Sequence, residues 1–241
     1  MTYYKNLKSE TSLNTKSGTA IVVSQEFYLL SALLVSRCSY IQSAIQNIIF
    51  KSHGLKIDEA KVALLDAPSP KARLQLLQSF TYENDDHIIT KAFAYAQTQF
   101  TDIYNLRNIL AHETWMTSEF HPNSVLFSKM AKQAQLQHSK EKFKKTDELN
   151  SKDIYNSILR YIRSVKVVST EDLQQALADA DRCAWIMMQI GFILEELDEV
   201  QKSEMKRAFL VFKGTNHLFD KKEISKNNVN VKRMNKKSIN H

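Results

Sequence analysis

The residue types that can do chemistry are gathered in one short stretch, residues 107–112. Within these six residues lie Arg107, Asn108 and His112. A guanidinium group is always charged, and its planar fork matches the oxygens of a phosphate group. An imidazole can transfer protons near neutral pH, and an amide can orient either partner by hydrogen bonding. Together the three side chains are what a site needs to hold and cleave a phosphodiester.

These residues end a stretch with helical periodicity, residues 87–112. Its apolar seam recurs at three- and four-residue steps and consists of Ile89, Phe93, Ala96, Phe100 and Ile103. On a helical wheel Arg107 continues this seam, whereas Asn108 and His112 lie on a polar stripe. Burying a charge is costly unless it is paired. We therefore expect Arg107 at the edge of a packed surface, with its head near the polar stripe.

A purely structural interpretation of the same residues competes with the chemical one. Arg107 can pair with a carboxylate such as Asp102 or Glu113, both of which lie nearby in the sequence. His112 would then only end the helix, where the helix dipole favours a His. Spacing alone leaves both interpretations open.

The sequence of residues 107–112, Arg-Asn-x-x-x-His, resembles the signature of the HEPN superfamily, the higher eukaryote and prokaryote nucleotide-binding helical domains. Catalytic members of that family are metal-independent endoribonucleases that cleave RNA through a composite site in a homodimer. The resemblance implies that Arg107 contacts the scissile phosphate and His112 acts as general acid or base. It implies that Asn108 orients the phosphate or the His.

The resemblance also implies a cellular role and an alternative to it. A toxin or phage-defence protein, with an antitoxin or regulatory protein as partner, fits the catalytic branch of the family. Many HEPN proteins are instead non-catalytic regulators. A helical interaction module that binds a protein or nucleic-acid partner is therefore the alternative function.

Composition predicts the fold class and the domain organisation. With only 4 Gly and 3 Pro in 241 residues, the chain has too few turn formers for a β-rich fold. We expect an all-α protein, an antiparallel helical bundle with a short β excursion at Ser124–Phe127; the resemblance implies the HEPN type of bundle. The expected organisation is a flexible N-terminal arm (1–20), a helical domain (21–200) and a basic C-terminal tail (201–241).

The positive charge of the chain is concentrated in that tail. The formal net charge is +7, yet residues 201–241 contain eleven Lys or Arg against three Asp or Glu, a charge of +8 that leaves −1 for residues 1–200. A basic tail can recruit RNA through phosphate contacts and counterion release. A solvated extension without a partner is the alternative.

Other site classes lack the residues they need. The two cysteines, Cys38 and Cys183, form neither a disulfide framework nor a metal-binding spacing, and no glycine-rich phosphate loop occurs. We therefore expect no metal and no cofactor.

No export signal or membrane-spanning run is recognised, so we expect a cytoplasmic protein that does not engage a membrane. Three aromatic residues near the motif can stack on bases or pack in the core: Tyr104, Trp115 and Phe120.

Overall fold

The computed structural model describes residues 2–7, 23–52, 87–118, 121–145, 151–194, 199–211 and 218. This part of the chain is mostly helical, as predicted, with six helices and one small sheet of four strands. The elements in chain order are β1 (Lys5–Asn6), α1 (Gln25–Ser52), α4 (His87–His112), β2 (Thr114–Met116), β3 (Ser124–Ser128), α5 (Met130–Lys145), α6 (Ser151–Ser164), β4 (Lys166–Ser169), α7 (Thr170–Ile193) and α8 (Glu199–Val211). None of these described helices is both long and apolar enough to cross a bilayer.

Local capping explains where two of the long helices begin. At the start of α1 the backbone N–H of Phe27 donates to Oγ of Ser24 at 3.2 Å, which satisfies one of the unpaired donors of the first turn. At the start of α7, Ser169 and Asp172 cap each other. The N–H of Asp172 donates to Ser169 Oγ at 3.1 Å, and the N–H of Ser169 donates to Asp172 Oδ2 at 2.9 Å. This reciprocal pair is a capping box.

The chain divides into two compact units. The first comprises residues 1–38 and 101–179, and it contains the sheet together with α5 and α6. The second comprises residues 39–100 and 180–241 and is helical wherever the structure describes it.

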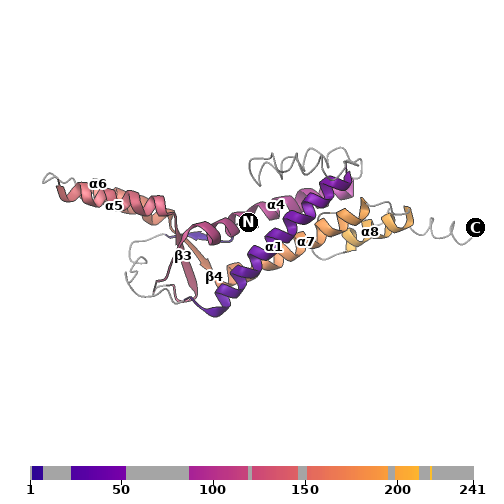
Figure 1. The fold of residues 1–241 in the computed structure, drawn as a ribbon, viewed down its shortest axis with the longest axis horizontal. Coiled ribbons are helices and arrows are strands. Elements are labelled where there is room, and N and C mark those ends of the chain that lie inside the picture. Colours follow the sequence, from indigo (N-terminus) through magenta and orange to yellow (C-terminus); the bar gives the residue numbers. More distant parts are fainter. Residues whose placement is uncertain are drawn as a thin grey trace, which may run out of the picture. The chain divides into compact units, whose positions relative to one another are not determined.

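The sheet of the first unit has the strand order β1-β4-β3-β2, and all three pairings are antiparallel. Its register places three pairs opposite each other: Lys5 and Val167, Val125 and Val168, and Trp115 and Phe127. Beside it α5 and α6 lie next to each other as a helical hairpin (Figure 1). One buried cluster joins the strands to this hairpin and consists of Leu7, Leu126, Ile162 and Val165.

The β excursion is larger than the sequence predicted. The expected strand at Ser124–Phe127 is β3, which pairs with β2 on one side and β4 on the other. β1 pairs with the free edge of β4. β1 lies inside the expected N-terminal arm, where Tyr3 and Leu7 are 3% and 4% exposed. The missed strands have two to four residues, too few to display a period of two. Residues 8–20 of the arm lie outside the described part.

The second unit packs the later half of α1, the earlier half of α4, the end of α7 and α8. Its buried apolar side chains include Ile41, Ile45, Ile48, Phe93, Ala96, Met187, Ile190 and Phe209. The ring of Trp185 meets that of Phe209 edge to face, with the centroids 5.6 Å apart. α8 carries the first eleven residues of the predicted basic tail, 201–211. The rest of the tail, apart from residue 218, lies outside the described part.

Candidate active site at the end of helix α4

The candidate site lies on the last turns of α4, which belong to the first unit. One face of these turns is buried through Ile103, Leu106 and Ile109, each at most 3% exposed. Burial of that face fixes the rotation of the helix and leaves Arg107 half-buried at its edge, while His112 is exposed. The predicted position of Arg107, at the margin of a packed surface, is thus found in the structure.

The side chains of the motif contact one another. Nη1 of Arg107 donates to Oδ1 of Asn108 at 3.1 Å and lies 3.4 Å from Nε2 of His112. The guanidinium carbon of Arg107 also lies 5.8 Å from the ring centre of Tyr104, a cation–π distance. The structure therefore brings all three predicted residues into one cluster.

The chemistry of the two groups determines how the contact between Arg107 and His112 can be made. A guanidinium has donors only, so the Nε2 atom of His112 has to accept. This hydrogen bond is made by the tautomer that carries its proton on Nδ1. In this arrangement the lone pair of Nε2, the atom that can take up a proton, faces the cation.

Cys38 on α1 is the buried neighbour of the cluster. Burial raises the pKa of its thiol from 9.0 to about 12, and the positive charge of Arg107 acts in the opposite direction. At neutral pH this thiol is uncharged, so it does not neutralise Arg107. The sequence held no signal for the proximity of Cys38 to Arg107.

Of the two carboxylates expected to compete for Arg107, Asp102 and Glu113, the second is engaged with a lysine. Oε1 of Glu113 lies 2.5 Å from Nζ of Lys166 on β4, and the Lys166 ammonium lies 5.3 Å from the ring centre of Tyr4. Among the described residues Arg107 forms no ion pair. Glu113, one of the two carboxylates expected as a partner, therefore pairs with Lys166 and not with Arg107.

An aromatic cluster follows the motif. Nε1 of Trp115 donates to the carbonyl oxygen of Leu110 at 2.9 Å, which ties the indole to the last turn of α4. Tyr28 of α1 stacks on Trp115 with centroids 5.4 Å apart, and Phe127 meets Trp115 edge to face at 5.3 Å. Tyr28 is 51% exposed, so one aromatic surface beside the motif is open to a ligand.

Two expectations about this region have different outcomes. Trp115 packs in the cluster, as one of its two expected roles required, whereas Phe120 lies outside the described part. Tyr28 was missed because nothing in the sequence links the start of α1 to Trp115. Within the described ranges no group of three or more His, Cys, Asp or Glu is placed to hold a metal ion.

Comparison of the chain with family models, curated proteins and solved structures gives no match. The resemblance to HEPN proteins therefore rests on the sequence of residues 107–112 alone.

Proposed function

We propose that the chain is a metal-independent endoribonuclease of HEPN type that acts as a homodimer. The observation that carries this proposal is the contact of Arg107 with both Asn108 and His112 at the end of α4. Arg107 has no carboxylate partner among the described residues, and it lies next to an imidazole that can accept a proton. Cleavage of a phosphodiester without a metal needs at least these two groups.

The reaction uses the 2′-hydroxyl of the RNA as nucleophile. The 2′-oxygen forms a bond to the adjacent phosphorus while Nε2 of His112 takes its proton. The bond from phosphorus to the 5′-oxygen breaks, and that oxygen receives a proton from the partner subunit's His112. The products are a 2′,3′-cyclic phosphate and a 5′-hydroxyl.

Arg107 stabilises the charge that develops on the phosphate oxygens. To do so its head has to turn from His112 toward the phosphate, and this movement frees Nε2 for the incoming proton. Asn108 holds the guanidinium through its Oδ1 atom. The exposed ring of Tyr28 offers a surface on which a neighbouring base can stack.

The test is cleavage of single-stranded RNA by the full chain in the presence of EDTA, with the products identified by mass spectrometry. His112→Ala and Arg107→Ala are expected to lower the rate by about 10²–10⁴-fold, because each removes a group needed in the transition state. Asn105→Ala is the matched control, because Asn105 is exposed on the polar stripe of α4 that carries Asn108 and His112. This substitution is expected to leave the rate unchanged.

The outcomes separate the two functions. Absence of cleavage by the wild-type chain across varied RNAs would overturn the nuclease and favour the non-catalytic helical module. If the nuclease acts as a toxin, cells that express the wild-type chain are expected to grow more slowly than cells that express the His112→Ala variant.

A further inference from the structure

A second cluster of cationic side chains lies away from the motif, in the helical hairpin formed by α5 and α6. The two helices lie side by side in Figure 1, and a cavity of about 350 Å³ opens between them. Its cationic lining comes from Lys132 on α5 and Arg160 on α6, and His138 of α5 adds an imidazole ring. Ser157 and Tyr161 add hydroxyl groups to the same lining. We call this cavity the hairpin groove.

Among the residues whose side chains the structure describes, none that lines the groove is acidic. Glu141 of α5 and Asp153 of α6 lie farther along the two helices. Residues 129–138 and 155–164 contain Lys129, Lys132, Arg160 and Arg163 but no Asp or Glu. Among the described residues neither Lys132 nor Arg160 forms an ion pair. Cations that are grouped without carboxylates repel each other and attract an anion.

The groove is held in place by contacts with the sheet. The hydroxyl of Tyr161 donates to Sδ of Met116 on β2 at 3.8 Å, and Nε2 of Gln133 on α5 donates to the same sulfur at 3.7 Å. Ile162, next to Tyr161, is 1% exposed in the buried cluster that contains Leu126. β2 begins two residues after His112. The groove and the candidate active site are therefore parts of the same compact unit.

We propose that the hairpin groove binds the phosphate backbone of RNA and serves as a docking site separate from Arg107 and His112. The proposal rests on the proposed nuclease function for its choice of RNA among phosphate-bearing ligands. Lys132 and Arg160 contact phosphate oxygens, and the hydroxyl groups of Ser157 and Tyr161 donate hydrogen bonds to the backbone. The hairpin thus supplies affinity, while the end of α4 supplies the chemistry.

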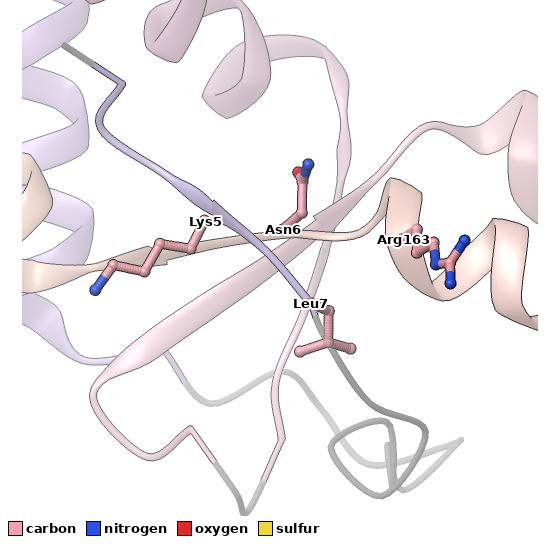
Figure 2. A pocket seen from close by; sticks show the side chains of 4 residues that line it. All are labelled: Lys5, Asn6, Leu7 and Arg163. Atoms are coloured by element: carbon pink, nitrogen blue, oxygen red, sulfur yellow. The ribbon is translucent and has the colours of Figure 1, made fainter.

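A matched pair of double variants tests the groove. Lys132→Gln with Arg160→Gln removes two charges from the groove. The control variant, Lys129→Gln with Arg163→Gln, also removes one Lys and one Arg charge. Lys129 directly precedes α5 and Arg163 lies on α6, but neither residue lines the groove. Arg163 instead lines a different cavity, of about 510 Å³, with Lys5, Asn6 and Leu7 of the N-terminal strand (Figure 2).

Binding is measured as the fluorescence anisotropy of a labelled single-stranded RNA at several salt concentrations in EDTA. All variants carry His112→Ala, which leaves the RNA intact during the measurement. The groove variant is expected to bind about tenfold more weakly than its parent, and the slope of log affinity against log salt should fall by about 1.4, two phosphates at about 0.7 each. The control variant is expected to change affinity by less than about twofold, since it removes no phosphate contact.

Equal losses of RNA affinity in the two double variants, or no loss in either, would overturn the proposal that the groove binds RNA. Circular dichroism confirms folding, and the single variants Lys132→Gln and Arg160→Gln provide the same test if the double variant does not fold. Cleavage by the chain without His112→Ala is assayed separately. If the chain cleaves RNA but the groove variant binds RNA as tightly as its parent, only the docking proposal is rejected. If the groove variant binds RNA more weakly but the chain cleaves no RNA, only the nuclease proposal is rejected.

Discussion

Nη1 of Arg107 reaches Nε2 of His112 at 3.4 Å although the two residues are five positions apart on α4. Side chains that meet directly on a helix are three or four positions apart, and a spacing of five turns the second by about 140° from the first. The contact exists because the long stem of Arg107 curves around the helix surface, and because α4 ends at His112. The same Nη1 atom also donates to Oδ1 of Asn108.

Arg107→Lys tests whether the fork of the guanidinium matters beyond its charge. A single ammonium group cannot hold Asn108 and two phosphate oxygens in one plane, so cleavage should fall by about 10²-fold, comparable to the loss of one oriented donor. Initial rates on one RNA substrate in EDTA measure the effect. Arg163→Lys, the same exchange on α6, is expected to retain the wild-type rate. Wild-type cleavage by Arg107→Lys would show that charge alone is sufficient.

The ion pair of Glu113 and Lys166 is expected to stabilise the fold. Their side chains are 7% and 18% exposed and joined at 2.5 Å, so removing one charge leaves the other buried and unpaired. Lys166→Met should lower the free energy of unfolding by about 3 kcal/mol, measured by urea denaturation. Adding Glu113→Gln should recover part of that loss. Additive losses in the double variant would mean that the two residues are not coupled.

Local sequence patterns predicted the parts of the structure that depend on neighbouring residues. The periodicity from residue 87 to residue 112 predicted α4 with the bounds that the structure has. The cluster of Arg107, Asn108 and His112 followed from spacing within a single helix. In each case the interacting groups are close in sequence, so the helix geometry alone brings them together.

Contacts between distant parts of the sequence were not predicted. Strand β1 pairs Lys5 with Val167, and the ion pair joins Glu113 to Lys166. Neither contact has a local pattern, because the pairing of short strands is determined by the packing of the whole unit. The hairpin groove was missed for the same reason, because its lining comes from two helices that the sequence does not place side by side.

Tyr3→Phe tests whether the N-terminal residues contribute to stability. The hydroxyl of Tyr3 donates to Oδ2 of Asp179 at 2.8 Å, and Asp179 is 3% exposed. Loss of a hydrogen bond to a buried carboxylate should cost about 1.5–3 kcal/mol in the free energy of unfolding. Tyr155→Phe is the control, because Tyr155 is 53% exposed and should change stability by less than about 0.5 kcal/mol. A Tyr3→Phe variant as stable as the wild type would contradict an anchoring role for the N-terminal residues.

The last prediction concerns Cys38 and alkaline pH. Its thiol has a pKa raised by burial from 9.0 to about 12 in the folded chain, partly opposed by Arg107. Below about pH 8 the thiol is protonated in both states and has no effect on the pH dependence of stability. Above pH 9 it ionises only when the chain unfolds, so the unfolded state is favoured as pH rises. The slope approaches about 1.4 kcal/mol per pH unit until the folded thiol also ionises.

The free energy of unfolding, measured by urea denaturation in the presence of a reductant at pH 8 and pH 10, gives the test. Between these two values the wild type should lose about 1.4 kcal/mol more than Cys38→Ala. Tyrosine and lysine side chains titrate in both proteins, so their contribution cancels in the difference. Parallel pH dependences of wild type and Cys38→Ala would show that Cys38 ionises equally well in the folded chain.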